Sequence, residues 1–527
     1  MTISLNITAE YWHSLTVTQR DIDFLQNHLF ETEIPLNIHQ LSSVLVAERI
    51  RLERESQALQ QKSAGDLYLP KNYYKKGQKL IFPALGMRKG QVTSIREGKN
   101  PELGEFQVLE VALEDGSSKS FAAGLAEHKL NAPIEEKISP EADPDTIIAN
   151  YGPALEKKLE LALGADGNLV KIAAHWFPAA LLVDINKGHL NLTEALLEMA
   201  GGEPLQTAKL MDQVDIKAGS NPRLLEFSFN YALQEDGRFD EVGPAGEVLW
   251  CLRRLEPEEV QRAPARLQYH LIEYDRAVLS SQMLALESEL DDELSETQFK
   301  HPNANEVTLV LSYPHWRSGT LPISSRARSF FPTAFESPRI CFTLVDGKSG
   351  LKFPAWVVRE NGYVFGLKAW FDANKLIPGG KITLRRSKNL GEVIIEAKTK
   401  RPAKDWVRTV LVGSDGGLVF SVLRQEVACE YDDRMVVFVP NVTAVDIAFD
   451  QMSRSRKPFE RVLKDMLREL SKLTPQGHVH AEELYSAINI LRRVPPAPML
   501  ATLVTNNDFS HVGDLHYRLT EMMLEEE

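Results

Sequence analysis

The chain has 527 residues, of which 43% are hydrophobic, and it carries a formal net charge of −13. Its length predicts about three to five domains, and its apolar content is ordinary for a soluble protein. No segment approaches the roughly 18 apolar residues that span a bilayer, so we expect no membrane association. The N-terminus has no basic stretch leading into an apolar run, and the three cysteines form neither a metal-ligand pair nor a disulfide framework. These features predict a cytoplasmic protein.

Residues 1–66 are expected to form an N-terminal helical, winged-helix-like region. Apolar residues recur at spacings of three and four after Thr18, and again after Pro35, which predicts one buried helix face. The run from Arg49 to Gln61 is highly charged, and we interpret it as a solvated helix end.

Residues 67–131 have the pattern of a small β-barrel. Short apolar segments alternate with turns that are rich in Gly and Asp, as at Asp115-Gly116. The predicted strands lie within residues 76–83, 91–95, 106–111 and 119–121.

One motif in this segment resembles a known family over residues 70–130. The run from Gly77 to Gly86, Gly-Gln-Lys-Leu-Ile-Phe-Pro-Ala-Leu-Gly, and the Gly-Gln-Val that begins at Gly90 are similar to the Tudor-like barrel of CarD and of transcription-repair coupling factors. Gln78 replaces the usual Asp, and three extra residues precede Gly90. The resemblance implies a barrel that grips an edge of the RNA polymerase β subunit. The alternative is a generic barrel that shares no partner with that family.

Residues 132–150 contain many Glu, Asp and Pro residues and are predicted to be a linker. Residues 151–262 are predicted to hold a helical segment followed by a winged helix. The first helix of that unit would begin at Asn191, with Glu194 completing a capping box, and the third helix would follow Asn221.

The wing itself is predicted from two strands at the end of this unit. Asp236-Gly237-Arg238-Phe239 leads into a Val-Gly turn, and Val248, Trp250 and Leu252 then alternate on one face of the return strand. Together with Pro-Leu before the second helix, this order resembles the HARE-HTH winged-helix family over residues 190–254. That family includes the RNA polymerase delta subunit.

A more divergent copy of the same unit is predicted in residues 456–527, with the resemblance covering 458–521. Its segments 507–513 and 515–519 repeat the acidic-aromatic start, the Val-Gly turn and the aromatic-x-Leu ending of the first wing. The copy lacks the Arg that precedes the aromatic residue in the first wing. A repeated supersecondary unit indicates an assembly of small modules.

Between the two copies, residues 263–304 are predicted to be a helical acidic spacer. Its acidic run, Glu287 to Glu296, is expected to face solvent.

Residues 305–455 are predicted to be β-rich. A strand at 363–366, a helix with paired aromatics at 367–375 and the following Leu-Ile-Pro-Gly resemble the DNA-binding pseudobarrel of plant transcription factors and some restriction enzymes over residues 305–400. The predicted fold class is therefore multidomain α+β, with winged-helix (helix-turn-helix) units and small β-barrel and pseudobarrel modules.

No catalytic motif is recognisable in the chain. There is no Gly-rich phosphate loop ending in Gly-Lys-Ser/Thr, no His-Glu-x-x-His and no Gly-x-Ser-x-Gly. The Gly-rich stretch 413–417 is interpreted as a hairpin turn, and His478 and His480 as solvated loop histidines without a third metal ligand. We therefore expect no enzyme activity, no cofactor and no metal.

The charge is unevenly distributed along the sequence. Residues 306–460 contain 23 Lys and Arg against 16 Asp and Glu, inside an acidic chain. A basic segment with an interleaved aromatic residue is typical of nucleic-acid contacts, although solvated loops would have the same composition. Arg454, Arg456 and Lys457 could widen the patch. The residues predicted to bind nucleic acid are Arg385, Arg386, Lys388, Lys398, Lys400, Arg401, Lys404, Trp406, Arg408, Arg326 and Arg328.

The third helices of the winged units lack the charge that DNA reading requires. The first, 222–233, offers Arg223 and Asn230 but also Glu226, and the second, 496–505, has no charged residue. Since phosphate neutralisation dominates affinity for DNA, these helices are expected to dock a protein or one another.

The sequence thus predicts a non-catalytic, DNA-associated factor linked to transcription. Its winged-helix and barrel modules would dock a protein partner such as RNA polymerase, and its basic pseudobarrel would contact DNA. Two alternatives remain open: a specificity or sensor subunit of a DNA restriction or defence system, and a protein-interaction scaffold that binds no nucleic acid.

Overall fold

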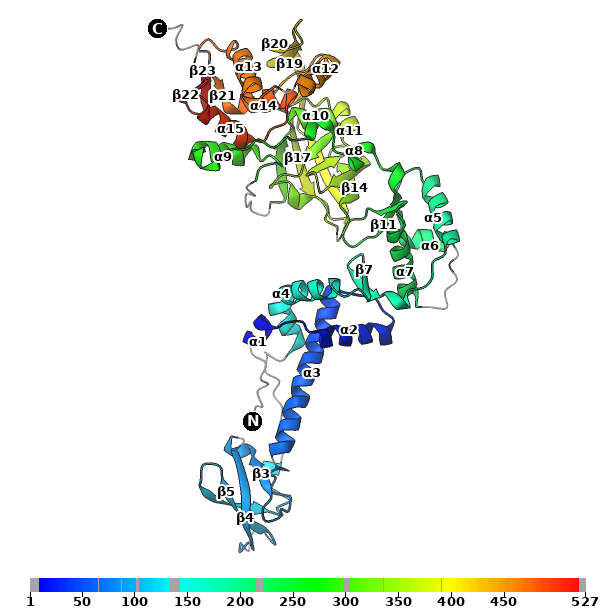
Figure 1. The fold of residues 1–527 in the computed structure, drawn as a ribbon, viewed down its shortest axis with the longest axis vertical. Coiled ribbons are helices and arrows are strands. Elements are labelled where there is room, and N and C mark those ends of the chain that lie inside the picture. Colours follow the sequence, from blue (N-terminus) through cyan, green and yellow to red (C-terminus); the bar gives the residue numbers. More distant parts are fainter. Residues whose placement is uncertain are drawn as a thin grey trace. The chain divides into compact units, whose positions relative to one another are not determined.

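A computed structural model shows a mixed fold that is 40% helical and 27% strand and contains a curled half-barrel sheet, which confirms the multidomain α+β class (Figure 1). The chain forms two compact units: Met1–Asp184 with Ala218–Tyr231, and Ile185–Lys217 with Ala232–Glu527. None of the described helices is long and apolar enough to cross a membrane. The structure describes residues 9–64, 66–86, 88–100, 104–131, 143–214, 216, 221–296, 304–334, 336–389, 391–455 and 457–520.

Unit 1 begins with helices, as the sequence predicts. They are α1 (Ala9–Ser14), α2 (Gln19–Thr32) and α3 (Ile38–Ala64), and α3 includes the charged run that was predicted to be helical. Thr18 and Asp21 form a capping box at the start of α2, and Asp21 also accepts a hydrogen bond from Arg49 at 2.6 Å. A small antiparallel sheet follows in the order β1 (Leu36–Asn37), β8 (His175–Pro178) and β7 (Leu169–Ile172).

The prediction of a linker over residues 132–150 is wrong from residue 144 onward, where α4 (Pro144–Gly164) begins. Asp143 caps this helix because its carboxylate accepts a hydrogen bond from the Thr146 amide at 3.0 Å. Pro144 occupies the first turn, where a missing N–H costs nothing. Acidic and proline residues therefore mark a helix start here. Residues 132–142 lie outside the described residues.

The barrel segment of unit 1 folds into a five-stranded sheet in chain order, and its four predicted strands are confirmed. A short additional strand, β2, runs parallel to β3, and the other neighbours are antiparallel. The core between the strands is aromatic and aliphatic and includes Tyr68, Phe82 and Leu109. The strands are β2 (Asp66–Leu67), β3 (Lys79–Phe82), β4 (Arg88–Glu97), β5 (Gln107–Leu113) and β6 (Ser118–Ala123).

The first of the two repeated segments contains the predicted three helices and two strands. The expected helix start at Asn191 is wrong, because α5 begins at Lys187 and Asn186 caps it by accepting from the His189 amide at 3.1 Å. Asn191 instead accepts a hydrogen bond from Arg238 at 2.9 Å. The elements are α5 (Lys187–Met199), β9 (Leu205–Gln206), α6 (Thr207–Val214), α7 (Pro222–Glu235), β10 (Phe239–Glu241) and β11 (Leu249–Leu252).

The second repeated segment lies at the end of unit 2 and begins with α13. Six apolar side chains of α13 are buried, which confirms the apolar stripe predicted there. The segment also contains three short strands, which form an antiparallel sheet in the order β21, β23, β22. Its elements are α13 (Phe459–Ser471), β21 (Val479–His480), α14 (Ala481–Leu491), α15 (Pro496–Thr505), β22 (Phe509–Gly513) and β23 (His516–Leu519).

The two repeated segments have equivalent strand registers. Phe239 pairs with Leu252 in the first, and Phe509 pairs with Leu519 in the second. Each return strand also pairs with a short strand from earlier in its segment: β11 with β9 and β23 with β21. The similarity of the two sequences therefore reflects the same three-stranded arrangement, with order β10-β11-β9 in one and β22-β23-β21 in the other.

A seven-stranded sheet forms the centre of unit 2, in the order β12-β17-β18-β14-β15-β16-β13. Only β14 and β18 run parallel; the other neighbours are antiparallel. Short helices α10 (Tyr313–Ser318) and α11 (Lys368–Ala373) contact each other. The strands are β12 (Glu306–Val310), β13 (Thr320–Pro322), β14 (Arg339–Asp346), β15 (Lys352–Val358), β16 (Tyr363–Phe365), β17 (Lys381–Arg386) and β18 (Glu392–Ala397).

The turn before β17 requires glycine. Gly379 has φ of +89°, and a Cβ there would lie 2.5 Å from the Val436 Cα. The close approach lets the 432–437 segment pack against the sheet, and the Asp432 amide donates to the Gly379 carbonyl at 2.9 Å. One hydrophobic core consequently runs from the sheet into the second repeated segment.

Candidate nucleic-acid interface

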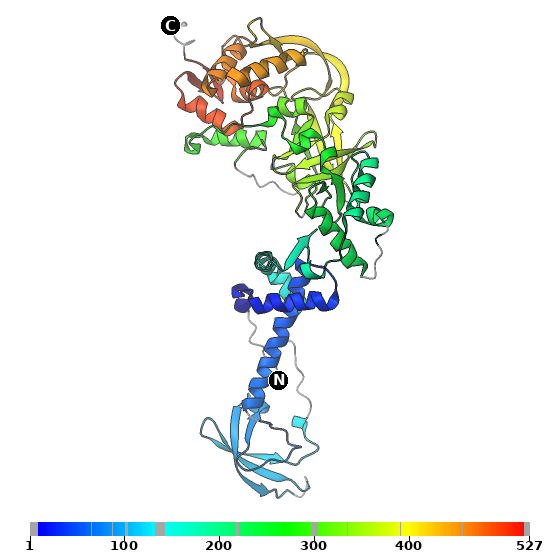
Figure 2. The same cartoon turned by 45° about the vertical axis from the view of Figure 1, so that its right-hand side comes forward.

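The strands β19 (Thr399–Val412) and β20 (Leu418–Cys429) form a two-stranded antiparallel ribbon, drawn in yellow at the edge of unit 2 in Figure 2. The turn between them confirms the hairpin predicted at 413–417. The half of the ribbon next to this turn is buried through Val410 and Phe420 and contacts helices α12 (Val442–Ser455) and α13. The middle of the ribbon is exposed.

Trp406 is the most exposed large apolar side chain of this ribbon, at 69%. Arg424 lies directly opposite it in the register, and Lys404 lies opposite Glu426. Directly paired residues of an antiparallel pair project from the same face, so these four side chains share one face. Arg401 is exposed nearby on β19. The arrangement offers an uncovered indole with cationic groups on both strands.

Two of the predicted lysines are less available than the others, Lys400 because its side chain is paired and Lys398 because it is half-buried. The Lys400 Nζ lies 2.6 Å from the Asp405 carboxylate and 4.7 Å from the Tyr431 ring. The hydrogen bond to Asp405 raises the pKa of Lys400. Lys398 is half-buried, and its backbone carbonyl accepts from the Glu430 amide at 2.7 Å.

The prediction that Arg408 contacts nucleic acid is wrong, because its side chain is only 7% exposed. Its guanidinium donates to the Arg434 carbonyl at 2.8 Å and lies 3.6 Å from the Glu483 carboxylate. Burial holds the pKa of Arg408 below its ordinary value. Arg408 thus ties β19 to the segment before α12 and to α14.

The remaining predicted residues form a separate group at the other end of the sheet. In the pairing of β17 with β18, Ile382 is opposite Ala397, whereas Arg386 is opposite Val393. The ribbon continues from the Ala397 end, so residues 385–388 lie roughly a strand length, about 15 Å, away. The eleven predicted residues are therefore not one surface.

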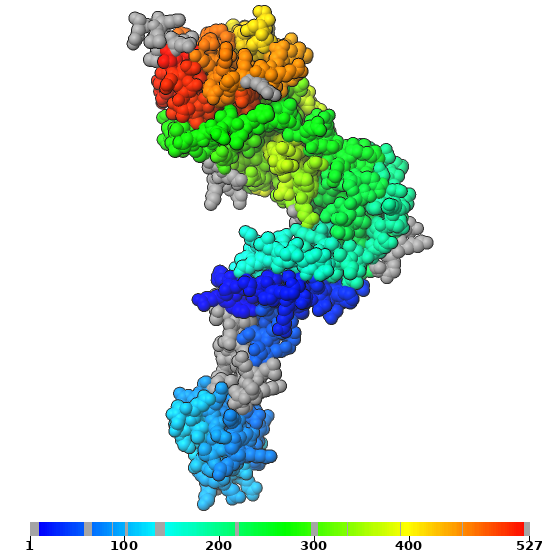
Figure 3. Space-filling view, in the orientation of Figure 1, coloured from blue at the N-terminus to red at the C-terminus, as the bar shows by residue number. Residues whose placement is uncertain are grey.

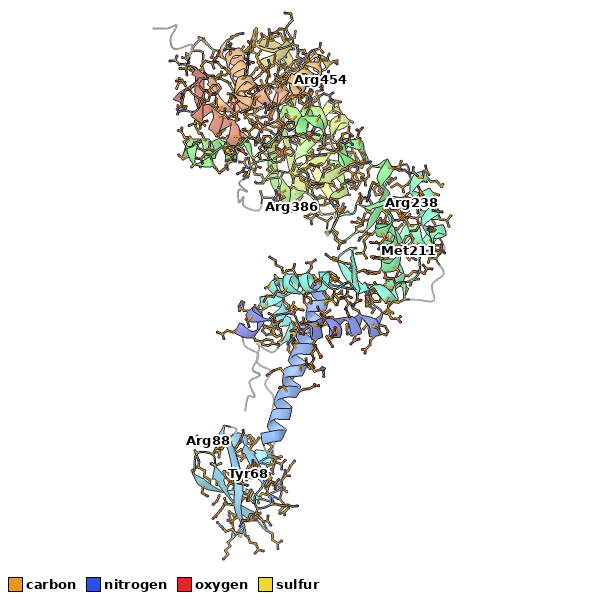
Figure 4. All side chains as sticks on the ribbon, in the orientation of Figure 1. Tyr68, Arg88, Met211, Arg238, Arg386 and Arg454 are labelled. Atoms are coloured by element: carbon orange, nitrogen blue, oxygen red, sulfur yellow. The ribbon has the colours of Figure 1, made fainter. Side chains whose placement is uncertain are left out.

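Within this second group, the cations differ in how free they are. Arg385 contacts the carboxylates of Glu396 and Glu306. The Arg386 guanidinium (Figure 4) lies 5.0 Å from the Phe330 ring and donates to the Ser329 hydroxyl at 3.1 Å.

The other members of this group are Lys388, Arg328 and Arg326. Lys388 and Arg328 are exposed. Arg326 donates to the Ser288 carbonyl at 2.6 Å and is held against α9. Of the residues suggested to widen the patch, Arg456 lies outside the described residues.

The prediction that the acidic run of the 263–304 spacer faces solvent is wrong for part of the run. Helix α9 (Ser281–Leu290) buries Met283 and Leu286 in the core of unit 2. Glu287, Asp291 and Asp292 are buried as well, whereas Glu289 and Glu296 are exposed. Asp292 accepts two hydrogen bonds from Arg493, at 2.6 and 2.8 Å, and one from the Tyr485 hydroxyl. An acidic run identifies a solvated surface only when no buried cation is available to pair with it.

The neighbouring Glu293 extends this buried network. Burial by itself raises the pKa of Glu293, but Arg493 at 2.7 Å and His315 at 3.1 Å outweigh it and hold the pKa well below its usual range. His315 also lies within hydrogen-bonding distance, 2.8 Å, of the Thr320 hydroxyl. The network connects α10, the segment after α9 and the second repeated segment.

Both third helices of the repeated segments are covered by other parts of the chain. In α15, seven of the ten residues are buried, and the helix packs against α9 and the 3₁₀ turn Arg276–Val278. In α7, the Phe227 ring lies 5.9 Å from Phe177, and the Ser228 hydroxyl accepts from the Val183 amide at 3.0 Å. Both helices therefore pack against other parts of the chain, although Arg223 and Glu226 of α7 are exposed.

His516 lies beside the two histidines singled out in the sequence, with ring centroids 4.8 Å from His478 and 5.0 Å from His480. The His480 Nδ1 accepts from the Glu482 amide, and the sequence interpretation of His480 as a solvated residue is wrong because it is buried. Within the described part of the chain, no group of three or more His, Cys, Asp or Glu side chains is arranged to hold a metal ion. The cysteines Cys251, Cys341 and Cys429 are free and buried.

Arg424 is a member of this interface that the sequence prediction missed. Its position follows from the hairpin: because Val412 is opposite Leu418, counting back along both strands places residue 424 opposite residue 406. The turn at 413–417 therefore contained the necessary signal. Comparison with family models, with curated proteins and with solved structures finds no match to this chain.

Proposed function

We propose that this chain is a non-enzymatic, DNA-associated factor that holds DNA on the exposed middle of the β19–β20 ribbon. The observation that carries the proposal is Trp406, which is 69% exposed and lies across from Arg424. An exposed indole that shares one face with Arg424 and Lys404 offers a flat ring beside positive charge, which favours a partner that offers both flat rings and negative charge.

The chemistry of this face favours DNA with unpaired bases. An indole stacks on an accessible base, and such stacking is worth about 1–3 kcal/mol per base. Arg424 and Lys404 can contact flanking phosphates, and the planar guanidinium can do so with two parallel hydrogen bonds. Glu426 opposite Lys404 offsets part of this charge, so affinity would come from stacking as much as from phosphate contacts.

We infer that the two repeated segments are winged helices that serve for docking within the chain. Their equivalent registers support a shared wing, and their covered third helices argue against DNA reading. A link to transcription is supported by sequence resemblance alone, to the HARE-HTH family and to the Tudor-like barrel of polymerase-binding proteins. Partner capture from a lysate is the test, and absence of RNA polymerase subunits would remove this part of the proposal.

The ribbon is tested by fluorescence anisotropy with labelled single-stranded and duplex DNA. Trp406→Ala should lower affinity for the single strand about tenfold or more, because a stacking contact is lost. Phe30→Ala removes another exposed aromatic residue, on α2 and outside the proposed site, and serves as the comparison. Unchanged binding by Trp406→Ala together with Arg424→Glu would exclude the ribbon as the DNA site.

The same titration separates the two alternative functions. Binding that depends on base modification, without polymerase capture, would favour a restriction or defence subunit. A chain that binds no DNA even at about 50 mM salt, where phosphate contacts are strongest, would be a protein scaffold.

A further inference from the structure

The loop between β2 and β3 of unit 1 presents three lysines and a tyrosine to solvent. Lys71, Tyr73, Lys75 and Lys76 are all exposed, and Tyr73 is 68% exposed. The barrel segment that contains this loop is light blue in Figure 3. Only the ribbon with Trp406 offers a comparable exposed ring beside several cations among the described residues.

The loop is fixed by its own hydrogen bonds. The Lys71 amide donates to the Asn131 side chain at 2.9 Å, and the Gly124 amide donates to the Asn72 carbonyl at 3.2 Å. The Tyr74 side chain is buried beneath the loop. A loop held in this way presents its side chains without a large ordering cost when a ligand binds.

Tyr73 lies directly over the backbone of Gly124. A Cβ at residue 124 would come within 2.8 Å of the Tyr73 ring, and Gly124 has φ of +83°. Glycine at residue 124 therefore allows the Tyr73 ring to approach the backbone there. Most of the Tyr73 side chain still faces solvent, so its ring is accessible for stacking.

The lysines of this loop have no ion-pair partner among the described residues. The nearest acid in sequence, Asp66, already accepts a hydrogen bond from the Gln78 side chain at 2.7 Å, and Gln78 in turn accepts from the Lys75 amide at 2.8 Å. The Gln78 side chain thus closes the turn and is hydrogen-bonded to the Asp66 carboxylate. In the ribbon, by contrast, Lys400 is paired with Asp405.

We propose that this loop is a second nucleic-acid-binding site, which takes a single-stranded segment by its phosphates and by one unstacked base. Lys71, Lys75 and Lys76 would neutralise phosphates, and Tyr73 would stack on the base. The chemistry favours nucleic acid over an acidic polypeptide because an exposed ring on a hydrogen-bonded loop, with lysines on either side of it in the sequence, matches a base flanked by phosphates. The site stands independently of the ribbon.

The test uses the full chain and a fluorescein-labelled single-stranded oligonucleotide, with anisotropy measured over a salt series. Each single-strand phosphate contact contributes about −0.7 to the slope of log affinity against log salt. Reversing Lys71, Lys75 and Lys76 to Glu should reduce the magnitude of this slope by about 2. Tyr73→Ala should lower affinity about tenfold and leave the slope unchanged, because stacking releases no counterions.

The matched control reverses three other exposed lysines of the same barrel, Lys89, Lys99 and Lys119, to Glu. It has the same net charge, so an equal loss of binding in both triple variants would mean general charge attraction and would overturn the site. Unchanged binding by Tyr73→Ala would overturn it as well. Thermal melting of each variant confirms that the fold is retained, since all of the substituted side chains are exposed.

Two further measurements separate this site from its alternatives. If polyglutamate competes for the loop as well as an unlabelled oligonucleotide does, the occupant is an acidic protein segment and the proposal is wrong. Trp406→Ala, measured in the same assay, distinguishes the two sites: loss in the loop variants alone excludes the ribbon, and loss in the ribbon variant alone excludes the loop.

Discussion

In the first repeated segment, Trp250 lies opposite Leu205 across β11 and β9, and in the second, Tyr517 lies opposite Val479 across β23 and β21. The same three-stranded frame is nevertheless secured differently. The first copy is tied together at its surface, where Arg238 pairs with Glu194 and Asp236. The second copy is secured from inside the core. Two segments with the same three-stranded arrangement therefore differ in the polar contacts that hold them in place, and the shared strand register alone does not assign them the same role.

The buried ion pairs of the second copy and the surface pairs of the first should differ most in their contribution to stability. Arg493→Ala leaves the buried Asp292 without a cation and Glu293 with His315 alone, and should lower the free energy of unfolding by about 3–5 kcal/mol. Arg238→Ala should cost about 0–1 kcal/mol, because its side chain is 34% exposed and its pairs are screened by water. Chemical denaturation of both variants measures the difference. Equal losses would show that the two copies are secured alike.

Weakening the packing of α9 against α15 should give the next largest loss of stability. Leu286 on α9 is 4% exposed, so Leu286→Ala should create a cavity and cost about 2–4 kcal/mol. Leu284→Ala, at a position that is 36% exposed on the same helix, is the control and should cost much less. If both substitutions are nearly neutral, α9 is the solvated spacer that the sequence alone suggested, and α15 is free.

The two copies should also respond to pH in opposite directions. Burial raises the pKa of Glu241, the last residue of β10, to about 7. Burial, together with Arg434 and His516, lowers the pKa of His480, the N-cap of α14, to about 4. A raised Glu pKa gives stability that is complete below about 4.5 and is lost as the pH rises through 7. A lowered His pKa gives stability that is complete above about 6.5 and is lost as the pH falls through 4.

Conservative substitutions separate these two contributions. Glu241→Gln should gain stability relative to the wild type as pH rises from 5 to 7, by up to about 1.4 kcal/mol per pH unit. Its amide oxygen can still accept from the Gly243 amide. His480→Asn should gain relative to the wild type as pH falls from 6.5 to 4, for the opposite reason. Melting temperatures across this range provide the measurement, and parallel curves for variant and wild type would contradict the assignment.

Sequence periodicity was sufficient to predict the strands of the small barrel, the apolar stripe of α13 and the repeated hairpins, because each depends on neighbours in the chain. The predictions that failed concern features that depend on residues far away in the sequence. Glu287 to Glu296 reads as a solvated run until Arg493 and Arg276 are placed beside it. Likewise, Arg385 and Lys400 are close in sequence, yet β17 and β18 carry them to opposite ends of the sheet. Charge spacing along a strand pair cannot reveal this before the register is known.

The smallest expected effect concerns where the first copy begins. Asn186→Ala removes the side-chain oxygen that accepts from the His189 amide and should cost about 1 kcal/mol, the usual value of an N-cap. Asn191→Ala, at the start predicted from the sequence, removes only an exposed hydrogen bond from Arg238, which retains Glu194 and Asp236 as partners. Its cost should therefore be near zero. A larger loss for Asn191→Ala than for Asn186→Ala would place the helix start near Asn191 and not at Lys187. Arg238 would then contact the capping residue of the helix, and the surface pairs of the first copy would matter more to its stability than the comparison of the two copies implies.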